Sequence, residues 1–348
     1  MNTTESNPFA NMQASTVPPA VPGAMPLQGG SLGALETALP ALPLRLRQLL
    51  DAAATEIETG AFVAAFRRLC GPLSALWTEA RSTQRDDELL AIARAHRLYG
   101  LAQQDPFTER AANKPRGYAG DAVMMDYIYS GSAPVNTTPT GAGIFAATTR
   151  CATGLSVRYR RALLRSVIDE TASQVHGARI LSVASGHCRE LDGSLIQHNW
   201  FEGEVVALDQ DPLSCAEVQR AQAQHRVRVV ERGVRALVGR DSASQDLGQF
   251  DLIYSAGLYD YLPDAMAQRL SARLASLLRP GGRLLLANFL PACSGRGYME
   301  MIMDWHLIMR NKAEMLALCE GTSAPVADCF HDPHHNVVYV DMRAPGAA

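Results

Sequence analysis

Residues 178–211 read ARILSVASGHCRELDGSLIQHNWFEGEVVALDQD, and this stretch decides the fold class. Arg179–Val183 is a short run of β-prone residues, and Glu204–Leu208 is a second one that ends at Asp209. Between them, the small residues 184–186 predict a tight turn that lets a ligand approach the backbone, and we expect a helix after this turn. The order strand, turn, helix, strand, acid is typical of half of a nucleotide-binding α/β sheet.

The spacing inside this stretch narrows the class of ligand. Gly186 and Asp209 are 23 positions apart (209 − 186), close to the roughly 20 positions between a glycine turn and a ribose-binding carboxylate in dinucleotide folds. The G-x-G-x-x-G pattern is absent, because Ala184, His187 and Cys188 stand where glycines would be needed. We therefore expect a ligand with a ribose and no diphosphate. S-adenosylmethionine (SAM) is a common cofactor of this kind.

The chain downstream continues the alternation of strands and helices. A buried strand is expected within 249–257 and an amphipathic helix over 264–278. The helix ends at the turn Arg279-Pro280-Gly281-Gly282, and a strand over 283–287 follows it.

Two β-prone runs near the end of the chain, 326–331 and 337–342, are joined as a hairpin. Together with the preceding elements, they resemble the class I SAM-dependent methyltransferases over roughly residues 155–342. The resemblance implies an α/β fold: a seven-stranded Rossmann-like methyltransferase sheet with an antiparallel last strand. An N-terminal helical cap is expected to pack on it.

The resemblance also implies which residues contact SAM. Ser182 stands where the family usually has an acid, so Glu190 is a candidate partner for the SAM ammonium group; the alternative is a solvated acid in a first helical turn. Asp209 is the expected ribose ligand. The expected cofactor-binding residues are Ala184, Ser185, Gly186, Glu190, Asp209, Gly233, Val234 and Ser255.

Three further motifs extend the resemblance over most of the chain. They are KPRGYAGD at 114–121, VASGHCRE at 183–190 and GYMEMIMDWHLIMR at 297–310. Together they resemble a group of bacterial SAM-dependent methyltransferases associated with biosynthesis of 3-hydroxypalmitic acid methyl ester. The fold alone does not identify the acceptor, because one fold supports many substrates.

Candidates for the acceptor site come from the KPRGYAGD segment at 114–121, called the connector here, and from the loops expected at the carboxyl ends of the strands. Arg116 offers a planar fork that matches a carboxylate, with Lys114 beside it; alternatively, Arg116 and Asp121 pair with each other. A helix is expected over 296–310. The expected substrate-binding residues are Arg116, Tyr118, Tyr261, Trp305 and Arg310.

Methyl transfer to a carboxylate or a thioether needs no general base, whereas transfer to a hydroxyl or a protonated amine does. The candidate catalytic residues are Tyr259, Asp260 and His306. For His306, a structural role in a helix is the alternative. We expect no metal, because the histidines at 331, 334 and 335 have no partnering cysteine pair.

Composition agrees with a cytoplasmic enzyme. The net charge of −3 gives no electrostatic footprint for nucleic acid, and no apolar run reaches the ~18 residues of a membrane span. The seven cysteines are scattered without C-x-x-C pairs, which argues against zinc and against a disulfide framework.

Three regions are expected along the 348 residues. Residues 1–43 are rich in proline and poor in charge, which favours a disordered tail. Residues 44–154 form the helical cap with its connector, and residues 155–348 form the methyltransferase domain. Within the cap, helices are expected over 44–58, over 61–81 with a break near Pro72, and over 87–103.

The expected activity is therefore SAM-dependent methylation of a small-molecule metabolite, a carboxylic acid that gives a methyl ester. The alternatives are S- or N-methylation of an amino-acid-like molecule and a SAM-binding module without catalysis. A nicotinamide dehydrogenase is a further competitor, against which Ala184 and Cys188 argue. The sequence does not give the oligomeric state.

Overall fold

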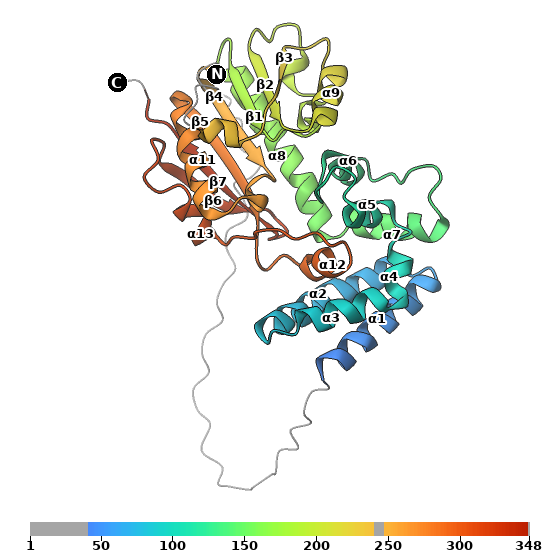
Figure 1. The fold of residues 1–348 in the computed structure, drawn as a ribbon. Helices are drawn as coiled ribbons and strands as arrows, with labels where there is room; N and C mark the ends of the chain where they lie inside the picture. Colours follow the sequence, from blue (N-terminus) through green and yellow to red (C-terminus); the bar gives the residue numbers. More distant parts are fainter. Residues whose placement is uncertain (1–40, 240–246, 347–348) are drawn as a thin grey trace, which may run out of the picture. The chain divides into compact units, whose positions relative to one another are not determined.

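The computed structural model of the protein describes residues 41–239 and 247–346. Its centre is a seven-stranded sheet with the order β3-β2-β1-β4-β5-β7-β6 (Figure 1). β7 runs antiparallel to β5 and β6, and the other neighbours are parallel. The predicted fold is confirmed. The strands are β1 (Arg179–Val183), β2 (Glu204–Asp209), β3 (Val227–Glu231), β4 (Phe250–Ala256), β5 (Leu278–Phe289), β6 (Val326–His331) and β7 (Val337–Arg343).

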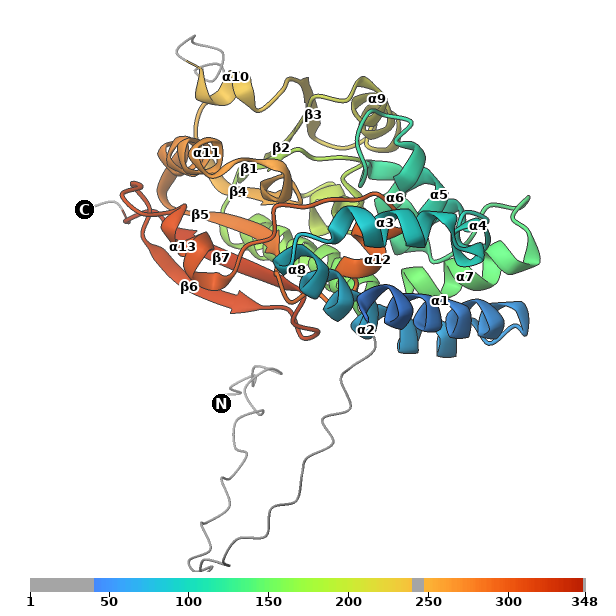
Figure 2. The same ribbon diagram turned by 60° about the horizontal axis from the view of Figure 1, so that its bottom comes forward.

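Successive side chains of each strand serve opposite faces of the sheet, as the two-residue period requires. Ile180 and Leu252 belong to the core that includes α8 (Ala152–Gln174), whereas Leu181 and Ile253 belong to the core that includes α11 (Asp264–Ser276). Figure 2 shows the sheet between these two helices. The other helices of the sheet region are α9 (Pro212–Ala221), α10 (Arg235–Val238) and α13 (Lys312–Ala317).

The N-terminal helices extend the core on the α8 face. Leu46, Leu69 and Leu89 are fully buried in a cluster continuous with β1 and β4. α12 (Arg296–Met301) packs on α2 (Figure 1), so closely that a Cβ at Gly297 would lie 2.6 Å from the Leu73 carbonyl carbon. These helices are α1 (Leu42–Glu58), α2 (Phe62–Ser82), α3 (Asp86–Ala95), α4 (Arg97–Ala102), α5 (Pro106–Asn113), α6 (Ala122–Ser130) and α7 (Pro139–Thr149).

Two predictions about the N-terminal helices are wrong. α2 continues through Pro72, because Leu69 and Leu73 are buried on either side of it and hold the helix in place. The single helix expected over 87–103 is two helices. His96 between them adopts an extended conformation, and its Nδ1 accepts the Leu98 amide at the start of α4.

The helix expected after β1 is also absent. Two short 3-10 turns, Arg189–Leu191 and Leu195–Gln197, replace it. Cys188 and Gly193 have φ angles of 50° and 72°, in the left-handed region that a right-handed helix cannot include. The chain therefore reaches β2 through an irregular segment.

Two differences concern the second half of the sheet region. The turn expected at 279–282 lies within β5, where the register with β4 shifts and Gly281 has a φ of 75°. The helix expected over 296–310 ends at Met301, because Asp304 has a φ of 49° and the chain to Arg310 is irregular. Trp305 and Ile308 therefore share no helical face.

The described residues, 41–239 and 247–346, belong to one compact unit. The predicted boundary between residues 154 and 155 lies inside α8, which joins the N-terminal helices to β1. The predicted tail, residues 1–43, lies outside the described residues as far as residue 40. The division into a cap and a methyltransferase domain stays a prediction.

Candidate active site

A cavity of about 920 Å³ lies at the carboxyl ends of β1, β2 and β4, where α/β sheets of this kind bind ligands. Two groups of segments enclose it. The turn side consists of the loops after β1, β2 and β3, with residues 184–190, 209–210 and 232–235. The connector side consists of lining residues within 116–129, part of α8, the loop after β4, and Phe289, Trp305 and Leu307. Small-molecule sites span about 300–1,000 Å³, so this cavity is large for one ligand.

The turn after β1 has the backbone form that a close ligand requires. Ala184 and Gly186 both have left-handed φ angles, 55° and 53°. The Ser185 amide donates to the Leu208 carbonyl at 3.1 Å, which ties the turn to β2. A Cβ at Gly186 would lie 3.3 Å from Cβ of Ala122 on α6, so this glycine is in tight contact with the connector side.

Asp209 ends β2, and its carboxylate faces this turn. Its Oδ2 accepts the Gly186 amide at 2.8 Å and its Oδ1 accepts the Asp211 amide at 2.9 Å. The side chain is buried and lines the cavity. Because each carboxylate oxygen has two acceptor positions, Asp209 can accept two further hydrogen bonds from a ligand diol.

The remaining predicted cofactor residues divide into two groups. Gly233 and Val234 follow β3 and line the cavity on the turn side. Ser255 lies inside the sheet, fully buried, and its hydroxyl donates to the Val183 carbonyl at 3.1 Å. Ser255 therefore ties β4 to β1 and is not among the residues that line the cavity.

Glu190 is not a solvated acid. It is buried at the cavity wall, and the Tyr254 hydroxyl donates to its Oε1 at 2.7 Å. Burial raises the pKa of Glu190 above its ordinary value, against that hydrogen bond. A ligand cation at this wall would compensate the buried carboxylate.

His187 forms a polar cluster on the turn side with α6. Its Nδ1 lies 2.8 Å from Asp126, and Arg189 donates two hydrogen bonds to the same carboxylate. Burial acts to raise the pKa of Asp126, but Arg189 and His187 outweigh it and lower the pKa to about 2. The Nε2 of His187 is buried without a hydrogen-bond partner among the described residues. Asp126 was not predicted, because no local pattern relates positions 126 and 187.

The charged residues of the connector all form ion pairs with other parts of the chain. Arg116 lines the cavity, but its Nη1 donates to Asp211 at 2.7 Å and to Ser214 at 3.0 Å. Asp121 forms its close ion pair with Arg110, at 2.6 Å, and caps α6, whereas it lies 3.9 Å from Arg116. Lys114 pairs with Asp304. Binding of a substrate carboxylate by Arg116 stays a prediction, and that carboxylate would compete with Asp211 for the guanidinium.

Aromatic side chains form part of the connector side. Tyr118, Tyr261 and Trp305 all line the cavity. The Tyr261 hydroxyl donates to the Ala119 carbonyl at 2.8 Å and accepts the Trp305 indole N–H at 2.8 Å. This chain of hydrogen bonds fixes the rings although 302–310 is irregular. The three predicted aromatic residues are therefore brought together.

Asp260 is the one predicted catalytic residue that lines the cavity. It is buried after β4, and its Oδ1 accepts the Phe289 amide at 2.7 Å. Burial raises the pKa of Asp260 to about 7, against that hydrogen bond. A carboxyl with this pKa can exchange a proton near neutral pH.

Three other predicted residues are not among those that line the cavity. The Tyr259 hydroxyl is buried and lies 3.0 Å from the Ser271 hydroxyl. His306 is half-exposed and contacts Asp304. Arg310 is buried in a structural role, with its guanidinium donating to Asp264, Asn288 and two backbone carbonyls.

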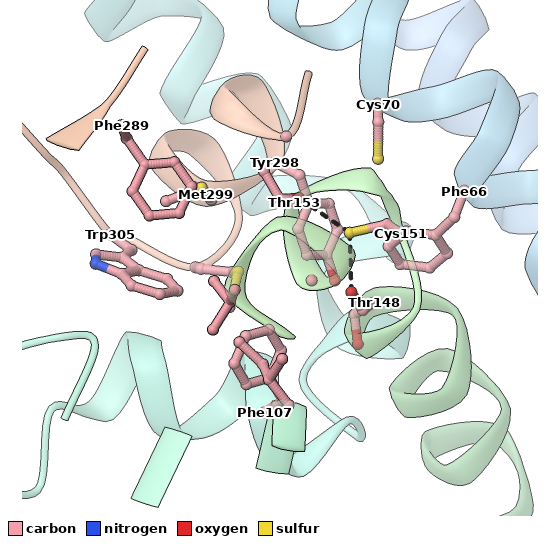
Figure 3. A pocket seen from close by; sticks show the side chains of 15 residues that line it. Phe66, Cys70, Phe107, Thr148, Cys151, Thr153, Phe289, Tyr298, Met299 and Trp305 are labelled. Carbon is pink, nitrogen blue, oxygen red and sulfur yellow. Dashed lines mark hydrogen bonds between the residues drawn. The ribbon is translucent and has the colours of Figure 1, made fainter. Parts of the chain in front are cut away.

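A second, smaller cavity of about 40 Å³ adjoins the first (Figure 3). Both cavities share Val157, Phe289 and Trp305 as lining residues. Figure 3 shows Phe66, Phe107 and Tyr298 among the other side chains around it. The lining is mostly apolar, so the cavity extends the connector side toward the N-terminal helices with a surface suited to hydrocarbon.

Comparisons with known proteins support the fold. No family model and no curated protein match the sequence. The crystal structure of a possible exported protein from Bordetella parapertussis is similar at a TM-score of 0.58 and 19% identity, covering 88% of this chain and 97% of that chain. This similarity extends the shared fold to the N-terminal helices.

Two methyltransferase structures are also similar, at lower TM-scores. A magnesium protoporphyrin IX methyltransferase from Synechocystis with bound SAM has a TM-score of 0.39 at 12% identity, covering 56% of this chain and 84% of that chain. An N-methyltransferase from Bradyrhizobium japonicum in complex with S-adenosyl-L-homocysteine has a TM-score of 0.40 at 12% identity, covering 54% of this chain and 87% of that chain. At these TM-scores the two structures establish no relationship.

Within residues 41–239 and 247–346, no helix is long and apolar enough to cross a membrane. In the same part of the chain, no three His, Cys, Asp or Glu side chains are grouped to hold a metal ion. All seven cysteines are free thiols.

Proposed function

We propose that the protein is a SAM-dependent methyltransferase that converts a small carboxylic acid to its methyl ester. The observation that carries the proposal is the carboxylate of Asp209, which faces the glycine-poor turn after β1 in a sheet that ends in an antiparallel β7. This arrangement suits a ligand diol. It offers no glycine-rich amide ring for the diphosphate of a nicotinamide cofactor.

The residues present fit SAM. The left-handed turn at 184–186 would approach its methionine part, and Asp209 would accept hydrogen bonds from both ribose hydroxyls. Gly233 and Val234 would border the adenine, and the buried Glu190 would pair with the ammonium group. When bound, SAM supplies an electrophilic methyl group on a sulfonium.

The chain's own residues would orient the acceptor and exclude water, which are the main protein contributions to such a displacement. Tyr118, Tyr261 and Trp305 supply rigid aromatic walls, and aromatic faces stabilise a nearby cation. A carboxylate acceptor is already a nucleophile, so no side chain has to remove a proton. Arg116 is the predicted carboxylate ligand, provided that it leaves Asp211.

The finer substrate proposal is an acid with an apolar chain. The resemblance to methyltransferases associated with 3-hydroxypalmitic acid methyl ester points to this class. The shared wall of Val157, Phe289 and Trp305 supports it, because hydrocarbon placed there would continue toward the second cavity.

Calorimetry and a labelling assay test the proposal. The protein should bind SAM and S-adenosylhomocysteine (SAH) but not NAD. With methyl-labelled SAM and a panel of straight-chain and 3-hydroxy carboxylic acids, mass spectrometry should find labelled esters. Binding of NAD alone would refute the proposal, and SAM binding without turnover on any acid or amine would identify a non-catalytic module.

One observation favours a second chemistry, S- or N-methylation of an amino-acid-like molecule. Asp260 has a pKa of about 7 and lines the cavity, so it could accept a proton from an acceptor amine. The same assay with amino acids and amines distinguishes the two. Product on nitrogen, with a rate that rises as Asp260 ionises, would select this alternative over ester formation.

A further inference from the structure

A guanidinium lies in the wall of the main cavity without an acidic partner. Arg160 on α8 is 5% exposed and lines the cavity. Among the described residues, no carboxylate oxygen lies within ion-pair distance of it, and its Nε has no hydrogen-bond partner. Its Nη2 donates to the Met125 sulfur at 3.4 Å, a weak acceptor, and the guanidinium also forms a hydrogen bond with the Tyr129 side chain.

The surroundings keep this guanidinium charged. Burial acts to lower the pKa of Arg160, but Tyr129, Tyr339 and Asp260 outweigh burial and raise the pKa above its ordinary value. The Tyr339 hydroxyl on β7 is itself buried without a hydrogen-bond partner in the described structure. A second unsatisfied polar group therefore lies near Arg160.

The position of the guanidinium is that of a ligand-binding group. A Cβ at Gly257 would lie 3.5 Å from its Nη1, which places the guanidinium at the carboxyl end of β4. Glu190 and Arg160 interact electrostatically and both line the cavity. A buried acid and a buried cation at one wall match a zwitterionic amino-acid group as well as a carboxylate.

A buried cation with no carboxylate at ion-pair distance costs free energy, so a position like this is typical of a binding site that the ligand completes. We propose that Arg160 binds a ligand carboxylate in this cavity. The ligand's identity rests on the proposed function: the carboxylate belongs to the methionine end of SAM or to the acceptor acid. Unlike Arg116, which pairs with Asp211, Arg160 has no carboxylate at ion-pair distance among the described residues, so its guanidinium can still take a carboxylate from a ligand.

Binding measurements with Arg160→Met distinguish the two sources. The first probes are SAH and 5′-deoxy-5′-methylthioadenosine, which keeps the adenosine and sulfur but lacks the amino-acid end. If the carboxylate is that of SAM, the variant binds SAH at least tenfold more weakly, about 1.4 kcal/mol, and binds methylthioadenosine like the wild type. The control is Arg165→Met, an exposed arginine on the same helix.

The second probe is decanoate, titrated at saturating SAH. If SAH affinity is unchanged but decanoate affinity falls at least tenfold in Arg160→Met alone, the guanidinium binds the acceptor. Equal affinities of variant and wild type for both ligands would overturn the proposal. A wild-type protein that binds neither SAH nor decanoate would refute the proposed function, and this proposal with it.

Stability of the ligand-free protein separates binding from a structural role. Replacing an unpaired buried charge by an apolar side chain should leave the Tm of Arg160→Met equal to or above that of the wild type. A lower Tm with unchanged ligand affinity would show a structural role and contradict the proposal. If Arg160→Met does not fold, Arg160→Lys is the second variant. It keeps the charge but loses the planar fork of the guanidinium, so it should still lower the affinity for the carboxylate ligand severalfold.

Discussion

The turn side and the connector side of the cavity are built in different ways. The turn side comes from three loops that each follow a strand, and its key contact joins Gly186 to Asp209 within one strand-to-strand unit. The connector side joins segments far apart in the chain, such as Ala119, Tyr261 and Trp305. Local sequence therefore determines the first, whereas tertiary packing determines the second. Substitutions can test this difference.

The largest effect on stability is expected from substitution of Asp260 on the connector side. In the folded protein its pKa is about 7, above the unfolded value near 4, so the native state holds the proton between these pH values. The free energy of unfolding therefore falls as pH rises from about 4 to about 7, by at most about 4 kcal/mol. Asp260→Asn keeps a side-chain oxygen that can accept the Phe289 amide, and it should remove this loss of stability at higher pH.

Denaturant unfolding of both proteins at pH 5 and pH 8 measures the effect. The variant should be more stable than the wild type at pH 8, with a smaller difference at pH 5. Comparing variant with wild type cancels the contributions of other buried acids such as Asp105, whose pKa burial raises to about 6. Parallel pH profiles would show that Asp260 is not responsible.

The next effect is expected at Gly120 in the connector. Its φ is 79°, and a Cβ there would lie 2.4 Å from the Tyr261 hydroxyl oxygen and 2.7 Å from the Trp305 ring. Gly120→Ala should lower the free energy of unfolding by about 1–3 kcal/mol more than Gly117→Ala, because it also breaks the hydrogen bonds of Tyr261. Gly117 is the matched control, since its φ is 84° but no atom lies within 4 Å of the added Cβ.

Equal destabilisation by the two alanine variants would mean that backbone strain alone matters. A larger loss for Gly120→Ala, accompanied by an increased acceptor KM, would show that the aromatic wall depends on this close contact.

A smaller effect is expected at Asp209 on the turn side. Asp209→Ala should weaken SAM binding at least tenfold, about 1.4 kcal/mol, as for the loss of hydrogen bonds to a charged group. Glu231→Ala is the control, because Glu231 ends β3 in register with Asp209 but is exposed and does not line the cavity. Calorimetry with unchanged affinity in the Asp209 variant would reject the ribose assignment.

The smallest effect is expected at His306. It is half-exposed, with Asp304 at 3.2 Å and the Glu300 carboxylate at 3.9 Å, so His306→Ala should change stability by less than about 0.5 kcal/mol and leave kcat within twofold. Steady-state kinetics measures this. A large loss of kcat in the variant, together with a wild-type pH–rate profile that follows the titration of a histidine, would support His306 as a catalytic residue.

The sequence was informative where local patterns dominate. The runs at 179–183 and 326–331 are strands with the predicted bounds, and Asp209 ends β2 as the spacing indicated. Tertiary contacts decided the rest: the extended conformation of His96, the 3-10 turns after β1 and the irregular chain around Asp304 have no signal of their own in the sequence.

Arg160 lines the cavity and was not predicted from the sequence, although a signal exists for it. It lies on α8 in helical register with the buried residues Val157, Leu164 and Val167, so it is a cation on an apolar stripe. Tyr259 and Arg310 show the opposite case, because they were predicted as site residues and do not line the cavity. Their residue types suit catalysis or carboxylate binding, but the sheet buries them among their own chain's partners.

The close contact of Gly297 with α2 has a practical meaning. The chain that carries Trp305 into the cavity is held by the helices at the other end of the sequence, through Gly297 and the Trp77–Glu300 hydrogen bond. A version trimmed to begin at α8 would retain every strand and every loop of the turn side, but the segment that carries the indole would lose its contacts with α2. Under the proposed function, shortening the chain would therefore separate recognition of the methyl donor from recognition of the acceptor.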